Sequence, residues 1–162
     1  MNKEIGKTVA LGAAAGAAGT ALLRGMIMGT QRFAPQMLPP IKKDPGEFMI
    51  KQAKNVLPRK IRRKIPEPVE ITAATALAFG YGMTFGSGYG ALRPRGGNIL
   101  LEGAALVTVT WAAGYLGWLP ATKLSPPVWK HRPKQTISNI LSHVVFGIAT
   151  VALFKWAREK LL

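Results

Sequence analysis

Four long apolar stretches, separated by polar and basic segments, dominate the pattern along this chain. They are residues 8–28, 69–92, 99–119 and 136–156, and each is 21 to 24 residues long. A helix rises about 1.5 Å per residue, so roughly 20 residues cross the hydrocarbon core of a bilayer. Backbone groups in lipid must be satisfied within the segment, which makes helices the expected form. The pattern predicts an all-α membrane protein with four transmembrane helices in a single domain of residues 1–162.

Formal charge is almost absent from these stretches. Each contains one charged residue: Arg24, Glu70, Glu102 and Lys155 in turn. A water-soluble helix of this length carries a polar face along its whole length, so a soluble helical domain is disfavoured. The first stretch follows a short basic start, as a signal peptide does, but it is long for one, and we expect it to be retained as a span.

Small residues line one face of the first two predicted spans. Gly12 and Gly16 form a small-xxx-small pair in the first span. In the second, small residues recur at every fourth position: Ala74, Ala78, Gly82, Gly86 and Gly90. Glycine costs about 1 kcal/mol per position in a helix in water, whereas in a membrane it lets two backbones approach closely. We expect this stripe to pack against another helix, with the first span as the natural partner and a second subunit as the alternative.

The connection of residues 29–68 is long and basic. Residues 46–57 place Met49, Ala53 and Val56 on one helical face, which predicts a short amphipathic helix. Candidate contact residues in this loop are Lys51, Lys54, Arg59, Lys60, Arg62, Arg63 and Lys64. An apolar face beside such cations is typical of a helix in the membrane interface, where each cation near anionic lipid contributes about 1 kcal/mol. The alternative is a docking surface for an acidic partner.

The overall charge fits the same interpretation. The chain has 22 Lys and Arg against seven Asp and Glu, a formal net charge of +15. Nucleic acid is a common partner of such basic chains, but no aromatic residues interleave the main basic run, as base stacking requires. We therefore expect anionic lipid and no nucleic acid. Cysteine is absent, which excludes disulfides and thiolate chemistry.

Four spans would place both termini on one side of the membrane. The connections then hold fourteen cations on the side of the large loop and seven on the side of the termini, which favours a cytoplasmic large loop. The short turn at residues 93–98 predicts an antiparallel hairpin of the second and third spans. We expect Tyr115 and Trp118 in the interfacial aromatic belt, and Thr136 or Ser138 as the N-cap of the last span.

Polar residues within the predicted spans are candidates for function by default. They are Arg24, Glu102, Asn139 and His143. The alternating topology places Glu102 near the termini, so we expect it to be neutralised by Lys7, Arg95 or Lys155; the alternative is a proton-carrying acid. Arg24 is expected to snorkel to the interface.

His143 could titrate near neutral pH or ligate haem or chlorophyll. It has no second ligand at a suitable spacing, so a hydrogen bond to a neighbouring carbonyl or threonine is favoured. The sequence has no Ser-His-Asp grouping, no phosphate loop and no metal-ligand spacing. We expect no catalytic residue, no metal and no cofactor, and an enzyme is disfavoured.

Three phrases in the second half of the chain form a set. They are FGYG to GYGALR within residues 79–93, LSPP at 124–127 and SHVVFG at 142–147. Together they resemble the YagU-like inner-membrane proteins of bacteria, over about residues 73–156. Relatives often have glycine where this chain has Ser142, and the basic loop has no counterpart in them. The resemblance implies a multi-pass protein of the bacterial inner membrane, in a family with no established biochemical role and a loose tie to acid stress.

These observations favour a non-catalytic accessory or structural subunit of a larger membrane protein complex. Its Gly/Ala-rich helices would pack together, and its basic loop would bind lipid or a partner. The first alternative is a small transporter or channel, proton-linked through Glu102 and His143. The second is a pigment- or haem-binding membrane subunit that uses His143.

Overall fold

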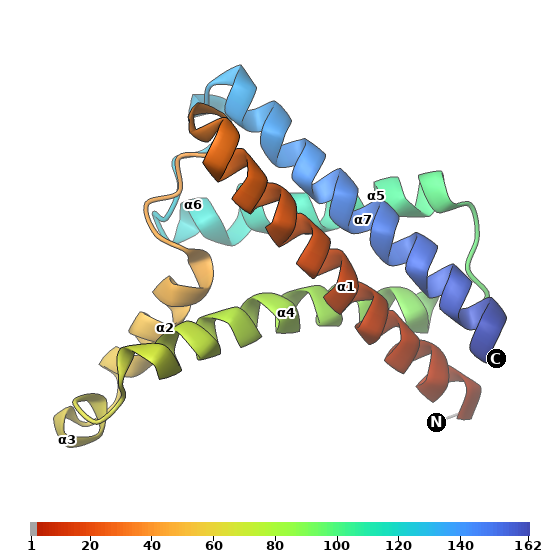
Figure 1. Ribbon diagram of the computed structural model, residues 1–162, viewed down its shortest axis with the longest axis horizontal. Helices are drawn as coiled ribbons and strands as arrows, with labels where there is room; N and C mark the ends of the chain where they lie inside the picture. The colour runs from red at the N-terminus through yellow and green to blue at the C-terminus, as the bar shows by residue number, and fades with distance from the viewer. Residues whose placement is uncertain (1–2) are drawn as a thin grey trace.

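The computed structural model describes residues 3–162, and that range contains helices and no strand (Figure 1). Its main helices are α1 (Lys3–Phe33), α4 (Glu67–Leu92), α5 (Ile99–Trp111) and α7 (Pro133–Leu161). The all-α prediction is confirmed. Shorter elements join them: η1 (Pro35–Met37), α2 (Pro45–Asn55), α3 (Arg59–Arg62), η2 (Ala112–Trp118), α6 (Leu119–Ala121) and η3 (Val128–Lys130).

Three helical segments within the described range are long and apolar enough to cross a membrane. They are Lys3–Phe33, Ile99–Ala121 and Pro133–Leu161. The predicted span of residues 69–92 is a continuous helix, α4, but it does not belong to this group. Its glycines and its threonine, serine and tyrosine side chains lower its hydropathy. Length and composition therefore indicate a membrane protein with three candidate spans and a fourth, less apolar helix.

The long helices lie in the spatial order α4, α1, α7, α5, so α7 contacts both α1 and α5 while α4 packs on α1 (Figure 1). The predicted hairpin of α4 and α5 forms only at its turn. The turn at residues 93–98 reverses the chain, but the two helices contact one another little beyond it. Each uses its small residues elsewhere: Gly86 of α4 faces α1, and Gly103 of α5 faces Ile148 of α7.

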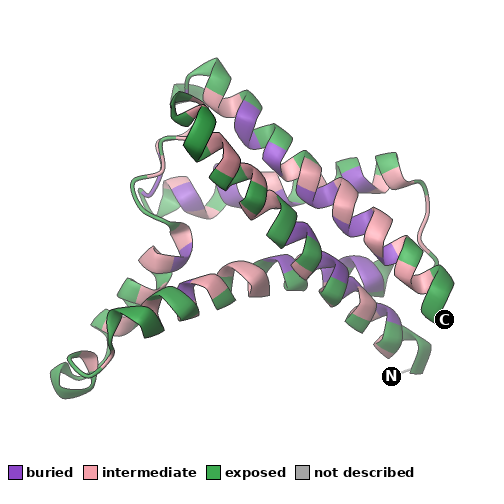
Figure 2. Ribbon diagram, viewed as in Figure 1, coloured by how far each residue is buried: buried purple, intermediate pink, exposed green. Residues whose placement is uncertain are grey.

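The main core lies where α7 meets its neighbours. Phe154 and Val151 are completely buried, and Phe146, Tyr89 and Leu106 join them. Buried residues gather between the long helices, and exposed residues follow their outer faces (Figure 2). Many of the exposed side chains are aliphatic: Leu22, Leu77, Leu100, Leu101, Val109, Ile137 and Leu141. Apolar exteriors of this extent are what hydrocarbon tails solvate, so the burial pattern agrees with a membrane protein.

A second core cluster lies at the far end of α5. Tyr115, Leu119 and Leu124 are buried there, and Ile41 and Phe48 of the large loop pack on them. Tyr115, predicted in the interfacial aromatic belt, is a core residue instead. A π-helical segment, η2, changes the helical period in this stretch, and Tyr115 is buried within it.

Hydrogen bonds fix the start of α2 within the large loop. Asp44 caps α2, since its carboxylate accepts from Gly46 N at 2.9 Å and Glu47 N at 3.1 Å. Lys42 N donates to Leu124 O at 3.0 Å, which joins the loop to the α6–α7 connection.

The start of α7 also differs from the prediction. It begins at Pro133 rather than after Thr136 or Ser138. The backbone of Arg132 donates to Gln135 Oε1 at 3.0 Å, and proline is preorganised for the first helical position.

Candidate functional site

The predicted small-residue stripe lies largely in the α1–α4 interface. A Cβ added to Gly12 would collide with the carbonyl oxygen of Gly86, and one on Gly16 would collide with that of Gly82. Moving four residues forward in α1, from Gly12 to Gly16, moves the contact four residues back in α4, from Gly86 to Gly82. The two helices therefore run antiparallel. Backbone meets backbone here, which only glycine permits.

The stripe is not one continuous contact with α1. Gly90 continues it, opposite the Thr8 carbonyl, but Ala74 lies against α2, where a Cβ on Gly46 would be 2.5 Å from the Ala74 carbonyl oxygen. Ala78 is half-buried between the two regions. The expectation of a single partner is corrected: α4 uses one end of the stripe to hold α1 and the other to hold α2.

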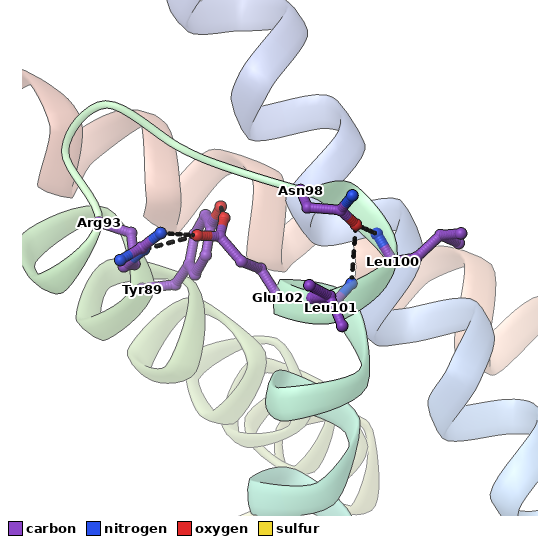
Figure 3. A network of polar contacts seen from close by, with 6 residues as sticks. All are labelled: Tyr89, Arg93, Asn98, Leu100, Leu101 and Glu102. Carbon is purple, nitrogen blue, oxygen red and sulfur yellow. Dashed lines mark hydrogen bonds and ion pairs between the residues drawn. The ribbon is translucent and has the colours of Figure 1, made fainter.

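Glu102 joins the end of α4 to the start of α5 (Figure 3). Its carboxylate accepts from Tyr89 Oη at 2.5 Å and from Arg93 Nε at 2.5 Å. The predicted partners Lys7, Arg95 and Lys155 are wrong, because the ion pair of Glu102 is made by Arg93, the residue that follows α4. The side chain of Glu102 is 12% exposed and that of Arg93 is 57% exposed. Glu102 therefore links α5 to the end of α4, and Arg93 neutralises its charge.

Two neighbouring contacts order the same turn. Asn98 caps α5, since its side-chain oxygen accepts from Leu100 N and Leu101 N at 3.0 Å (Figure 3). Arg158 near the end of α7 donates to Pro94 O at 2.6 Å. The turn thus connects three helices.

A cluster of aromatic and imidazole rings surrounds Tyr115. Its ring packs edge-to-face against His131 at 6.2 Å and His143 at 5.8 Å between centroids, and Trp111 stacks on it at 6.2 Å. His143 Nδ1 bonds to the Asn139 carbonyl at 2.9 Å, the hydrogen bond that the sequence favoured. The cluster was not predicted from the sequence, because its rings come from three segments that meet only through the fold.

His131 is the more constrained of the two histidines. Its Nε2 lies 2.9 Å from the Pro126 carbonyl and 3.0 Å from Ser125 Oγ. Because a carbonyl only accepts, Nε2 carries the proton. His131 Nδ1 and the side-chain nitrogen of Asn139 are buried without a hydrogen-bond partner among the described residues. Within residues 3–162 no three His, Cys, Asp or Glu side chains are grouped as a metal site.

The remaining predicted polar residue, Arg24, is half-buried on α1. It makes no ion pair within residues 3–162. It lies in neither the Glu102 network nor the ring cluster.

The basic loop forms a groove beside the start of α4. The groove holds about 650 Å³ and is lined by Lys43, Lys51 and Lys54 together with Arg62 and Arg63. Four of these five cations were singled out in the sequence; Arg59, Lys60 and Lys64 lie outside the groove. Lys54 pairs with Glu70 of α4 and donates to the Ile65 carbonyl at 3.3 Å. Only part of the basic loop therefore gathers at one site, the groove beside α4.

Part of the apolar surface of α2 and of the segment after it points away from the protein, while Phe48 packs on the second core cluster. Met49, Val56 and Leu57 are exposed, as is Ile61 of α3. An apolar face that no part of the described chain covers, beside a cationic groove, is the arrangement of an interfacial helix. Comparison with family models, curated proteins and solved structures finds no match, so function rests on this geometry.

Proposed function

We propose that this chain is a non-catalytic, multi-pass accessory or structural subunit of a larger membrane assembly, in the bacterial inner membrane. In this proposal α4 crosses the membrane beside the three more apolar segments. The α2–α3 segment then lies at the membrane surface, where it binds anionic lipid or an acidic partner. The bacterial location follows the resemblance to YagU-like proteins.

The docking of α2 carries the proposal. Gly46 packs against the backbone of α4 at Ala74, and Lys54 pairs with Glu70. These contacts hold α2 in a fixed position while Met49 and Val56 face outward. A rigid platform that presents cations and an apolar face together suits a role in holding other molecules at a membrane surface.

Two hydroxyl groups of α4 are satisfied within the helix, as in a membrane span. The hydroxyl of Thr72 donates to the Pro68 carbonyl at 2.8 Å, and that of Thr84 donates to the Gly80 carbonyl at 2.8 Å. Hydroxyls that bond within their own helix leave no donor unsatisfied in lipid. Both ends of the chain and the α4–α5 turn lie on one side of the molecule, and α2, α3 and α6 lie on the other (Figure 1). This arrangement supports four crossings.

The transport alternative has less support. Glu102 is held by Tyr89 and Arg93, whereas His143 belongs to the ring cluster around Tyr115. The two residues that would relay a proton therefore lie in separate networks at opposite ends of α5.

The test is purification of the tagged protein from its native membrane in a mild detergent, followed by mass spectrometry of co-purifying proteins. A stoichiometric larger partner is the expected result. Recovery of the chain alone, as a monomer or homo-oligomer, would contradict the subunit role. Proton flux in liposomes, compared between the unmodified chain and Glu102→Gln, would then test the transport alternative.

A further inference from the structure

Two hollows lie one after the other along α4, and one is lined by cations while the other is mainly apolar. The first is the cationic groove at the start of α4, with Lys51, Arg62 and Arg63 in its wall. The second is an open, mainly apolar furrow of about 590 Å³, lined by Ile50 of α2 and by Ala73, Ala76, Leu77, Gly80, Tyr81 and Thr84 of α4.

Both hollows occupy the same face of α4. Glu70 lines the cationic groove, and Ala73, Leu77, Gly80 and Thr84 of the furrow follow it at alternating steps of three and four residues. Residues at these steps share one helical face. On α2, Lys54 lines the groove and Ile50, one turn away, lines the furrow. The cationic groove thus lies at one end of the open apolar furrow, along the same face of α4.

The charge of the groove matches an anion. Its lining includes five cations and one carboxylate, Glu70, which Lys54 already neutralises. Lys43, Lys51, Arg62 and Arg63 form no ion pair within residues 3–162. Arginine forks bind phosphate oxygens two at a time, so this set suits a phosphate group.

The furrow has the length of one lipid leaflet. Eleven helical steps separate Ala73 from Thr84, a rise of about 16 Å. The hydrocarbon core of a bilayer is about 30 Å thick, so one leaflet is about half of that. An acyl chain that starts at the groove would reach the bilayer midplane near Thr84.

From these observations we infer that α2, α3 and the first half of α4 form a binding site for one anionic phospholipid. Its phosphate lies between Lys51, Arg62 and Arg63, and an acyl chain follows the furrow past Gly80. The inference deepens the lipid contact of the proposed function. It does not require a larger assembly.

Two triple variants test the binding of the phosphate headgroup, and each of them removes three positive charges. Lys51→Gln/Arg62→Gln/Arg63→Gln removes groove cations and keeps the Lys54–Glu70 pair, whereas Arg59→Gln/Lys60→Gln/Lys64→Gln removes cations outside the groove. Native mass spectrometry of the protein in mild detergent counts retained phosphatidylglycerol. We expect the groove variant to bind it roughly a hundredfold more weakly, because each of the three cations contributes about fivefold, and we expect the control to retain it. Equal losses would mean diffuse attraction and would overturn the site.

The acyl half has its own matched pair. Cβ atoms at Gly80 and Gly88 meet nothing within 4 Å, so leucine fits at both. Gly80→Leu fills the furrow and Gly88→Leu lies beyond it. We expect only Gly80→Leu to lower phosphatidylglycerol retention, by tenfold or more, with monodisperse elution of both variants.

Competition separates a phospholipid from a free anion. Inorganic phosphate at millimolar concentration should fail to displace phosphatidylglycerol, because it lacks the acyl chain. Displacement by phosphate, or full retention in Gly80→Leu, would reduce the site to an anion site and overturn the inference. If a protein partner co-purifies but no phospholipid does, this inference fails while the proposed function stands. Phospholipid without a protein partner gives the reverse result.

Discussion

Gly12 of α1 and Gly86 of α4 face each other so closely that a Cβ on either would collide with the carbonyl oxygen of the other. We expect Gly86→Ala to destabilise the protein by at least the 1–3 kcal/mol typical of overpacking, because the obstacle is backbone and cannot rotate away. Thermal unfolding in detergent measures the change. Gly88→Ala, on the open face of the same helix, is the control. An equal Tm for both variants would contradict the close contact of Gly86 with Gly12.

The Glu102 network should depend more on its tyrosine than on its arginine. Tyr89 is buried, so Tyr89→Phe leaves an oxygen of Glu102 without its donor and should cost about 1.5–3 kcal/mol, as for hydrogen bonds to charged groups. Arg93 is largely exposed, and exposed ion pairs contribute about 1 kcal/mol or less. Unfolding of both single variants in the same detergent gives the comparison. The reverse order would mean that the ion pair dominates.

Docking of α2 should be sensitive to volume at Gly46. A valine side chain there has no room against the Ala74 backbone, so Gly46→Val should release α2 from α4. Hydrogen exchange of the α2 amides, or protease cleavage after the exposed Arg59, should rise by at least tenfold. Ala53→Val places the same side chain on the exposed face of α2 and should leave both rates unchanged.

His131 should be structurally more important than its place in a connecting segment implies. His131→Ala removes a buried ring from Tyr115 and leaves the Pro126 carbonyl without its donor. A cost of about 2–4 kcal/mol follows from the cavity and the lost bond. Near-ultraviolet circular dichroism reports on the stacked Trp111–Tyr115 pair and should lose intensity. An unchanged spectrum and Tm would contradict this role.

The helix positions and the close-packed glycine face could be predicted from the sequence, because both depend on residues near one another in the chain. Helical period and span length are properties of neighbouring residues, so the main helices and α2 were found within a few residues. The four-residue stripe similarly indicated close backbone approach, and Gly82 and Gly86 lie in such a contact.

Features that depend on residues far apart in the chain were missed. The short turn at residues 93–98 predicted an antiparallel hairpin, but a turn fixes only the reversal of direction and not which helix faces meet. Burial of His131 depends on Tyr115 and on the π-helical segment that holds it, and neither has a periodic signature. The partner of Glu102 was misjudged because several cations share that end of the molecule, and only side-chain geometry selects Arg93.

The position of α7 constrains the order in which the bundle assembles. It is synthesised after α1, α4 and α5, yet it lies between α1 and α5 and supplies half of the buried residues of the main core. During translation the earlier helices can pair only as α1 with α4, and α5 must remain without its neighbour until α7 emerges. The glycine contact between α1 and α4 is therefore the one large helix pairing available to hold the unfinished chain together.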